Sequence, residues 1–546
     1  MTCREPERFQ AVVIGSGFGG SVTAFRLAEK GWDVLVLERG RPWPPGSFPR
    51  TPPAMGHALW DPPERFGMFD VWSFTGINAV AASGLGGGSL IYANVLMPAP
   101  ESAFRHEDCT PWPVLPAELD ARYADVGNIL NPVPYPKEHR RTTPKTQAMA
   151  AAAEAIGRSW ESTPLAVAFS ASEGDPPEIG ACLPDDPDNL FGLPRTTCRL
   201  CGECDIGCNY GAKHTLDHTY LSRARAHGAV LRTLCEVTAI APREDGYAVT
   251  YRQHLAGRGG VSEEFLDDPD HERVTVLADR VIVAAGTMGT ARLLMRNRIN
   301  LPRLGGRLGH GFSSNGDLLT FAWDSEKRLD MARGPVITGT MRWDEDPPTR
   351  RMFQVQDAGV PALAQWMFHA LEAPVTLAES RRARLLWLWR SFKGDRDTHI
   401  GSELAALIGE GTFSSGTLPL LGMGRDIPGG RFFLDGEDLD LSWREGDSRR
   451  FFDDLMHACR RVAGELGGEF RDVPIAHLIT VHALGGCAMA KDPRSGVVNE
   501  WGESFGHPGL YVADGSVLPG PVGANPGMTI AALADRFALH MRGDAQ

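Results

Sequence analysis

A glycine-rich turn that follows a short apolar run constrains the fold of this 546-residue chain more than any other feature. The run Ala-Val-Val-Ile at residues 11–14 is typical of a buried parallel strand. Gly15, Gly17 and Gly20 then fill the three glycine positions of the G-x-G-x-x-G pattern. The first glycine permits a tight turn, the second lets a pyrophosphate approach the backbone, and the third packs a helix against the strand.

The residues after this turn complete a βαβ unit. A helix is expected to run to Lys30, and residues 34–37 are expected to form a second strand that ends at Glu38. An acid at this spacing accepts hydrogen bonds from a ribose hydroxyl, while the pyrophosphate lies at the positive N-terminus of the helix. An ordinary glycine turn in an α/β protein is the alternative, but it leaves Glu38 unexplained. The unit therefore predicts dinucleotide binding.

Length and composition limit the classes of protein to consider. A chain of this length can bury a large core and is expected to form two domains. The net charge of −13 and the pI near 5.7 oppose nucleic-acid binding, which needs a basic face. The first residues lack the apolar stretch of a signal peptide, and no apolar run is long enough to span a bilayer. These features predict a soluble, cytoplasmic protein.

A second glycine-rich segment lies at residues 84–95, where four glycines stand beside apolar residues. Such a segment is typical of backbone packed against a flat or charged group, and a flexible loop is the alternative. Further along the chain, helical patterns recur at residues 116–130, 146–156, 216–226, 290–296 and 448–466. Patterns typical of strands occupy residues 230–251 and 273–285.

Residues 381–392 (RRARLLWLWRSF) mix arginines with leucines and tryptophans. A helix of this composition could lie on a membrane surface, as a peripheral contact, or could cap an apolar substrate. A buried helix with arginines at its ends is the alternative, and we favour it.

Four cysteines cluster in one short segment, at residues 198–208. They are Cys198, Cys201, Cys204 and Cys208, with the spacing C-x2-C-x2-C-x3-C of bacterial ferredoxin ligands. Three of them could wrap one 4Fe–4S cluster, and a remote fourth ligand such as Cys182 would then be needed. Structural zinc and reduced or disulfide-paired thiols are the alternatives.

Several separated stretches together resemble the glucose–methanol–choline (GMC) flavin oxidoreductases, and most closely their bacterial cholesterol-oxidase branch. They are the glycine turn with Glu38 and residues 84–95, 210–220, 281–294, 309–317, 482–487 and 510–526. The resemblance implies an α/β fold with a Rossmann-like FAD-binding domain built from residues 8–100, 210–310 and 475–546. An α+β substrate domain with a large, mostly antiparallel sheet would comprise residues 101–209 and 311–474 and include the cysteine-rich segment.

The resemblance also implies roles for single residues. Those implied for the ADP half of FAD are Gly15, Gly17, Gly20 and Glu38, and those implied beside the flavin and its ribityl-phosphate arm are Gly86, Gly87, Gly88, Ser89, Asn94 and Val95. Val237 corresponds to a residue whose backbone meets the adenine, Asp514 to an acid that contacts the ribityl chain, and Met528 to a residue near the pyrimidine edge. His482 and Asn525 match the pair that faces the reactive side of the flavin.

Alcohol oxidation, the activity that the resemblance implies, requires such a pair. Flavin N5 accepts the hydride, histidine titrates near neutrality and suits the hydroxyl proton, and asparagine offers the same hydroxyl both a donor and an acceptor. We expect an apolar substrate that is alicyclic, sterol-like or long-chain. The alternatives are a sugar or aminocyclitol, or an iron–sulfur flavoprotein that acts mainly in electron transfer. Oxygen, or an electron-acceptor protein or quinone, would reoxidise the flavin.

Three positions depart from the family pattern. Ala483 stands where the family often has proline, and Gly527 replaces a bulky aromatic residue, which would widen the pocket or an access path. Gln356 occupies the place of the glutamate that moves a proton during steroid isomerisation in the cholesterol-oxidase branch. Glutamine has no proton to titrate, so coupled isomerisation is not expected unless Asp357 substitutes.

Overall fold

The computed structural model describes residues 5–105, 110–254, 256–257, 260–261, 273–344, 351–361, 415–471 and 479–543. The segment 381–392, for which a membrane or substrate contact was considered, lies outside these residues. No helix within the described ranges is long and apolar enough to cross a membrane.

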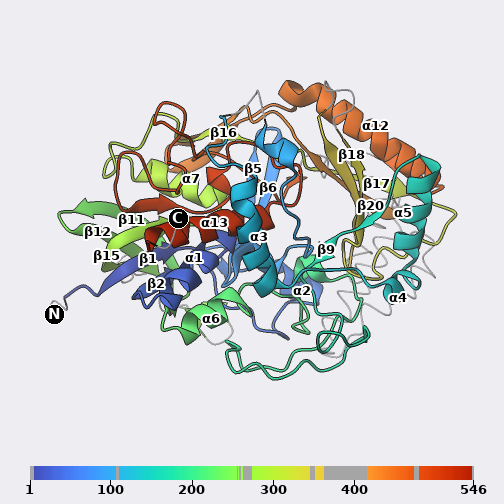
Figure 1. The fold of residues 1–546 in the computed structure, drawn as a ribbon, viewed down its shortest axis with the longest axis horizontal. Helices are drawn as coiled ribbons and strands as arrows, with labels where there is room; N and C mark the ends of the chain where they lie inside the picture. The colour runs from blue at the N-terminus through green and yellow to red at the C-terminus, as the bar shows by residue number, and fades with distance from the viewer. Residues whose placement is uncertain are drawn as a thin grey trace, which may run out of the picture.

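A seven-stranded sheet forms the nucleotide-binding half of the molecule (Figure 1). Its parallel strands are β10 (Val230–Arg232), β2 (Val34–Leu37), β1 (Arg8–Ile14), β15 (Arg273–Val283) and β25 (Leu510–Val512). The antiparallel hairpin β11 (Cys235–Arg243) and β12 (Gly246–Gln253) extends it beyond β15. Neighbouring strands come from the beginning, middle and end of the chain, so the expected assembly from discontinuous segments is confirmed.

The helices on this sheet differ in one respect from the expected division of the chain. Helix α1 (Phe18–Glu29) packs against β1 and β2, as expected for a Rossmann-like domain, and α6 (Tyr220–Ala226) and α13 (Gly527–Met541) pack against α1. Helix α3 (Ala117–Leu130) packs on α13 and joins the same core through apolar side chains such as Leu119 and Val126. The division at residue 101 that the resemblance implies assigns α3 to the substrate domain, whereas the apolar side chains of α3 meet the nucleotide-binding core.

The second half of the molecule contains a six-stranded sheet in which every neighbouring pair is antiparallel. Its order is β23 (Glu469–Arg471), β17 (Leu318–Trp323), β20 (Leu418–Gly424), β19 (Phe353–Asp357), β18 (Gly339–Trp343) and β8 (Glu161–Ser162). Helices α12 (Arg449–Glu465) and α5 (Pro144–Ala155) contribute to the core that this sheet encloses. In Figure 1 this sheet and α12 lie to the right of the nucleotide-binding sheet.

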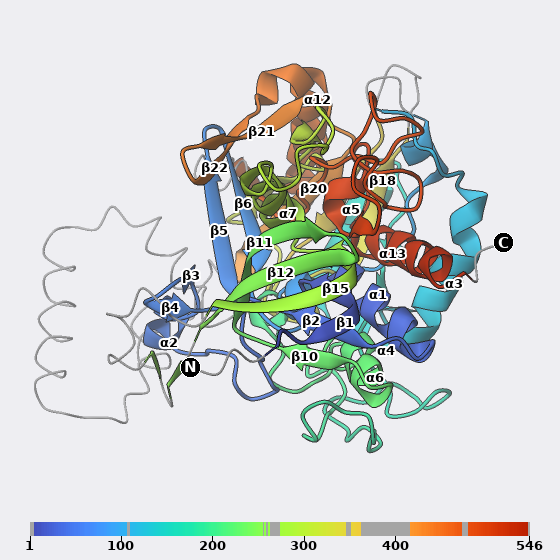
Figure 2. The same ribbon diagram turned by 90° about the vertical axis from the view of Figure 1, so that its left-hand side faces the viewer.

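A three-stranded sheet contains the strand that comes just before His482. Strand β24 (Ile479–Thr480) pairs in parallel with β6 (Ile77–Ala82), which forms a hairpin with β5 (Phe69–Phe74), seen at the left of Figure 2. The remaining longer elements are β16 (His310–Phe312), β21 (Gly430–Asp435), β22 (Asp438–Ser442), α7 (Thr287–Arg296), α2 (Pro52–Gly56) and α4 (Lys137–Arg140). Two-residue strands complete the fold: β3 (Trp60–Asp61), β4 (Arg65–Phe66), β7 (Val133–Pro134), β9 (Pro164–Leu165), β13 (Ala256–Gly257) and β14 (Gly260–Val261).

We expect the substitution Gly19→Ala to destabilise the nucleotide-binding half. A β-carbon on Gly19 would lie 1.5 Å from the backbone oxygen of Ala513, so helix α1 would have to move away from the end of β25. Such overpacking costs about 3 kcal/mol or more when backbone must shift. Thermal unfolding and flavin content would be measured, with Ser21→Ala on the same helix as the control. Equal melting temperatures for the two variants would contradict this account of the contact.

Candidate active site

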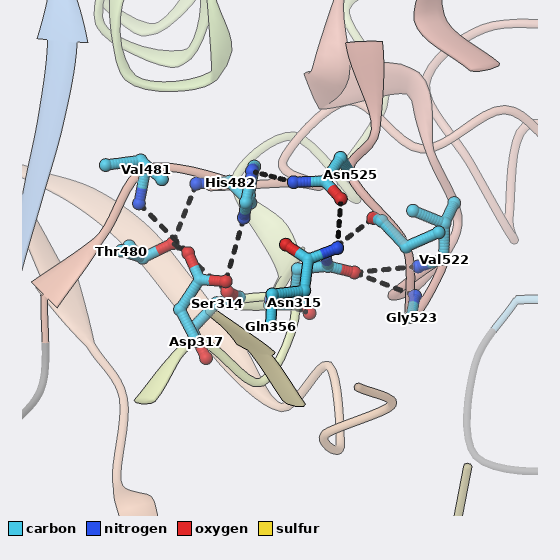
Figure 3. Close-up of polar contacts among 12 residues, drawn as sticks. Ser314, Asn315, Asp317, Gln356, Thr480, Val481, His482, Val522, Gly523 and Asn525 are labelled. Atoms are coloured by element: carbon cyan, nitrogen blue, oxygen red, sulfur yellow. Dashed lines mark hydrogen bonds and ion pairs between the residues drawn. The ribbon is translucent and has the colours of Figure 1, made fainter. Parts of the chain in front are cut away.

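The residues expected to carry the chemistry come from three distant segments that meet beside the antiparallel sheet (Figure 3). His482 lies just after β24, Asn525 lies just before α13, and Gln356 lies within β19. All three side chains are largely shielded from solvent, and Gln356 is fully buried. The tertiary fold therefore brings together the two predicted catalytic residues and the predicted departure at Gln356.

A chain of hydrogen bonds connects these side chains (Figure 3). Oδ1 of Asp317 lies 2.8 Å from Nδ1 of His482. On the other side of the imidazole ring, Nδ2 of Asn525 lies 3.4 Å from Nε2. Nε2 of Gln356 donates to Oδ1 of Asn525 at 3.1 Å. The polar order is therefore aspartate, histidine, asparagine and glutamine.

Asp317 is a site residue that the sequence reasoning missed. Its second oxygen, Oδ2, accepts from Oγ1 of Thr480 at 2.9 Å and from the backbone N–H of Val481 at 3.0 Å, so both oxygens point to the segment that carries His482. The Asp317 side chain is 1% exposed and that of His482 is 12% exposed. The likeness of residues 309–317 to the family was the available signal, but it named no partner for an acid so far from His482 in sequence.

Asn315 ties the loop before Asn525 to the loop that carries Asp317. Its Oδ1 accepts from the backbone N–H groups of Val522 and Gly523 at 3.0 and 2.9 Å, and its Nδ2 donates to the Ala524 oxygen at 2.9 Å. Asn315 has a φ of +55°, in the left-handed region that asparagine tolerates better than most residues. The short loop that carries Asp317 therefore also holds the segment that leads to Asn525.

Asp357, considered as a substitute for the missing glutamate, lies in a different environment from its neighbour Gln356. Successive side chains of a strand point to opposite faces, and Asp357 is fully buried in an ion pair with Nζ of Lys145 at 3.0 Å. Its carboxylate also accepts from the backbone N–H groups of Thr338 and Gly339 at 2.8 and 3.1 Å. These partners account for the Asp357 carboxylate without any role at His482.

A second buried carboxyl group lies near Asp317. Asp426 accepts hydrogen bonds from the hydroxyl of Ser313 and from the backbone N–H of Ser314, which precede Asp317 in the same loop. Burial raises the pKa of Asp426 to about 6, although these hydrogen bonds act in the opposite direction. Asp426 therefore supports the loop without touching the imidazole.

The first glycine turn has the geometry that a bound pyrophosphate needs. Gly15 has a φ of +98°, and a β-carbon there would lie 2.3 Å from the backbone oxygen of Ala284. A β-carbon on Gly20 would lie 2.1 Å from the Gly15 oxygen, so this glycine allows the helix to approach the strand. Gly17 faces open space, with nothing within 4 Å of a β-carbon position. Open space at the N-terminus of α1 fits a phosphate group.

The second glycine segment lies directly against this turn. A β-carbon on Gly87 would lie 2.6 Å from Cα of Gly17, and Gly86 has a φ of +110°. Gly88 faces open space, while Oγ of Ser89 donates to the Gly86 oxygen at 2.8 Å. The two glycine-rich segments of the sequence therefore form one continuous surface of backbone. The hydroxyl of Ser89 stabilises the turn at Gly86 in the second segment.

Asn94 gives an independent sign of a bound group. It is fully buried with a φ of +68°, and neither Nδ2 nor Oδ1 has a hydrogen-bond partner within the described protein. A buried amide with no partner is costly, so native structures normally supply one from a ligand or water. Val95 beside it is also buried. Together with the open glycines, this orphaned amide fits a flavin dinucleotide.

The Glu38 carboxylate retains room for one more donor. Its Oε2 accepts from the backbone N–H and hydroxyl of Ser16 at 3.0 and 2.6 Å, and its Oε1 accepts from the backbone N–H of Gly40 at 2.8 Å. A carboxylate offers about four lone-pair positions, so three are in use. Its contact with a ribose stays a prediction.

The Asp514 carboxylate already has four donors. They are the N–H of Gly286, the hydroxyl of Thr290, and the N–H and hydroxyl of Ser516. Burial raises the pKa of Asp514, and the hydrogen bonds counteract this effect. The expected ribityl contact of Asp514 stays a prediction, and its side chain mainly joins the start of α7 to the end of β25.

The two other residues expected along the cofactor come from different elements of the nucleotide-binding half. Val237 is in β11, close to Glu38, since the Cys235 N–H donates to the Glu38 oxygen at 2.8 Å. Met528 is buried in the first turn of α13, three residues after Asn525. Their contacts with adenine and with the pyrimidine edge stay predictions.

The cysteine-rich segment forms a recess lined by Cys198, Cys201, Cys204 and Cys208. All four are free thiols rather than disulfides. Cys182, considered as a remote ligand, is exposed and does not line the recess. The described part of the chain contains no group of three or more His, Cys, Asp or Glu side chains arranged to hold a single metal ion.

Buried charges surround these thiols. Lys213 is buried, and its Nζ donates to the backbone oxygens of Leu90, Tyr92 and Cys204 at 3.1, 2.9 and 2.9 Å. Burial raises the pKa of Cys201 to about 12, and the Glu203 carboxylate adds to this effect. Lys213 thus connects the recess to the second glycine-rich segment.

Side chains of Arg50 and Asn209 hold the cysteine-rich segment against residues 48–50. Arg50 forms an ion pair with Glu203 at 2.7 Å and donates to the backbone oxygens of Ile206 and Gly207. Asn209 exchanges two hydrogen bonds with the backbone of Phe48. The irregular region around residues 40–50 therefore fixes the shape of the recess.

Comparisons with known proteins agree with this geometry. Residues 194–311 and 468–534 match two sequence models of the GMC oxidoreductase family, and residues 13–42 match a model of an NAD(P)-binding Rossmann-like domain. The chain is 29% identical to a cholesterol oxidase of Mycobacterium tuberculosis, over 97% of this chain and 90% of that protein. It is 26% identical to the paromamine 6'-oxidase of Streptomyces fradiae, over 99% and 93% of the two chains.

The fold also matches a solved structure. The crystal structure of pyridoxine 4-oxidase from Mesorbium loti superposes with a TM-score of 0.59 at 17% identity, covering 97% of this chain and 99% of that one. Both sheets and both glycine-rich segments thus belong to a known architecture. The chain thus matches the GMC oxidoreductase family in two separate segments, and the proteins similar to it over nearly its whole length include a cholesterol oxidase.

Proposed function

We propose that this enzyme oxidises an alcohol to a carbonyl, with Nε2 of His482 accepting the hydroxyl proton. FAD, when bound along the glycine-rich surface, supplies the hydride acceptor. The residues that would hold it are Gly15, Gly17, Gly20, Glu38, Gly86, Gly87, Gly88, Ser89, Asn94, Val95, Val237, Asp514 and Met528. The observation that carries the proposal is the chain of polar contacts from Asp317 through His482 and Asn525 to Gln356.

The direction of these bonds follows from the aspartate. An ionised carboxylate only accepts hydrogen bonds, so Nδ1 of His482 carries the proton that points to Asp317. In a neutral imidazole the other nitrogen, Nε2, then carries a lone pair rather than a proton. Asp317 therefore acts as a positioning residue that keeps Nε2 ready to accept a proton.

Asn525 completes the site for the hydroxyl. Because Nε2 of His482 is an acceptor, the amide of Asn525 must present its N–H groups to it. A hydroxyl placed between them can give its proton to Nε2 while its oxygen accepts from Nδ2. This contact holds the oxygen in place as negative charge develops on it.

We infer the class of substrate from the proteins that are similar in sequence. We propose an alicyclic, sterol-like or long-chain alcohol, since a cholesterol oxidase is among the proteins most similar in sequence. The alternative is a sugar or aminocyclitol hydroxyl, which the likeness to a paromamine oxidase supports. Oxygen, or an electron-acceptor protein or quinone, would reoxidise the cofactor.

Coupled isomerisation is not part of the proposal. Gln356 has no titratable proton, and the Asp357 carboxylate is engaged by Lys145 and two backbone N–H groups. The product is therefore expected to keep the double-bond position of the substrate.

An iron–sulfur flavoprotein that acts mainly in electron transfer is the second candidate. The recess lined by four cysteines favours it. Among the described residues, no group of three or more His, Cys, Asp or Glu side chains is arranged to hold a single metal ion such as zinc. A 4Fe–4S cluster is a larger body that needs cysteines arranged around a hollow. Rapid bleaching of the flavin by an alcohol without oxygen would favour the alcohol oxidase.

The substitution Asp317→Asn should lower kcat by about 10²- to 10⁴-fold. The asparagine amide can donate to Nδ1 of His482 and so favours the tautomer with its proton on Nε2, which cannot then accept the hydroxyl proton. Anaerobic flavin reduction and FAD content would be measured, with His482→Gln as the lower limit. The control is Asp426→Asn, which alters the same loop without touching His482. Near-normal reduction by Asp317→Asn, or an equal loss in the control, would contradict the positioning role.

The substitution Gln356→Glu should make oxidation depend on a new proton. When ionised, the introduced carboxylate can only accept, so Asn525 must turn its N–H groups toward it and present its oxygen to Nε2 of His482. Activity relative to the native enzyme should therefore rise as the pH falls through the pKa of the introduced carboxyl, which burial raises above its usual value of about 4.3. The measurement is the ratio of kcat values across pH, and Gln356→Met, which has no such proton, should give a flat ratio.

Protein purified without oxygen should contain about four irons and four sulfides per chain if the recess holds a cluster. The thiols of Cys198, Cys201, Cys204 and Cys208 would be deprotonated by the iron. Cys204→Ser should lose most of the iron, whereas Cys182→Ser, outside the recess, should keep it. Native protein without iron and sulfide would leave these cysteines as structural thiols.

A further inference from the structure

The hydrogen-bond chain from Asp317 ends on an atom with no partner. Gln356 is fully buried, and its Oε1 has no hydrogen-bond partner within the described protein. Its Nε2 is committed to Asn525. Figure 3 shows the Gln356 amide beneath the contact between His482 and Asn525, with its oxygen on the side of His482. A buried acceptor therefore borders the place where the reacting hydroxyl is proposed to lie.

Rotating the glutamine amide cannot satisfy this oxygen. The Asp317 carboxylate fixes the proton on Nδ1 of His482, so Nε2 must receive N–H from Asn525, and the Asn525 oxygen must then receive N–H from Gln356. Each bond in the chain fixes the next one. Oε1 of Gln356 is left as an acceptor by the same logic that makes His482 a base.

The reacting hydroxyl cannot satisfy it either. A hydroxyl carries one proton, and the proposed mechanism gives that proton to Nε2 of His482. A substrate with only one hydroxyl would leave Oε1 of Gln356 without a donor while excluding water from it. Leaving a buried acceptor unpaired is costly, and sites built to bind a donor discriminate strongly against analogues that lack it.

We propose that Gln356 is a specificity-determining residue whose Oε1 accepts a hydrogen bond from a second donor on the substrate. The donor is a hydroxyl or amine close to the carbon that is oxidised, as in a diol or an amino alcohol. An alicyclic ring with a neighbouring hydroxyl or amine satisfies this requirement together with the class proposed above. The inference rests on the proposed function for the location of the substrate, but it concerns binding rather than turnover.

The test compares matched ligands on the holoenzyme. Dissociation constants would be measured by calorimetry without oxygen for cyclohexanol and for the 1,2- and 1,3-cyclohexanediols. At least one diol should bind the native enzyme about tenfold or more tightly than cyclohexanol. The preference should disappear in Gln356→Met, which lacks the acceptor. Gln354→Met, two positions away on the same strand, is the control and should retain the preference.

The outcomes separate this inference from the proposed function. Equal binding of cyclohexanol and every diol by the native enzyme would overturn the inference, because water would then satisfy Gln356 as well as a ligand does. A preference that persists in Gln356→Met would also overturn it. Tighter binding of a diol without flavin reduction by any alcohol would instead count against the proposed oxidation and leave the specificity role intact.

Discussion

The contact between Asp317 and His482 is the constraint on which the chemistry of this site depends. A carboxylate cannot donate, so it assigns the proton of the imidazole and, through it, the orientation of two amides. The aspartate can do this because it is itself held on both oxygens, by His482 on one side and by Thr480 and Val481 on the other. A polar chain with one fixed acceptor has one consistent arrangement of hydrogen bonds, and the proposed role of His482 as a base depends on it.

Two kinds of contact hold segments that are far apart in sequence in their places around the chain of hydrogen bonds. Asn315 ties the loop before Asn525 to the loop before β17, and Gln356 belongs to the same antiparallel sheet as β17. The nucleotide-binding half uses close backbone contacts instead. Gly19 lies against Ala513, and Gly87 lies against Gly17, positions at which any side chain would collide. Polar bonds therefore position the reacting groups, while glycines shape the surface for the cofactor.

The cysteine recess is built as firmly as the catalytic site. Arg50 and Asn209 hold its outer edge, and Lys213 connects its inner side to the backbone at Leu90 and Tyr92. Cys182, the most distant candidate in the sequence, is excluded from it by its position at the surface. The recess thus lies next to the second glycine-rich segment, which is expected beside the flavin.

The sequence by itself determined the elements whose signals are local. The glycine spacing and Glu38 predicted the βαβ unit, and residue periodicity predicted helices such as α3, α5 and α12, although it did not predict α13. The motif around His482 and the Asn-Pro pair at Asn525 indicated the two positions that we propose as catalytic. Only the tertiary structure decided what pairs across long separations. Asp317 and Gln356 became part of the site because two strands of one sheet bring them to His482 and Asn525, and α3 joined the nucleotide-binding core because its apolar face meets α13. The pattern of residues along a helix or strand shows which of its faces is apolar. The partner of a buried polar group and the core that a helix joins depend instead on distant residues, which only the tertiary structure brings into contact.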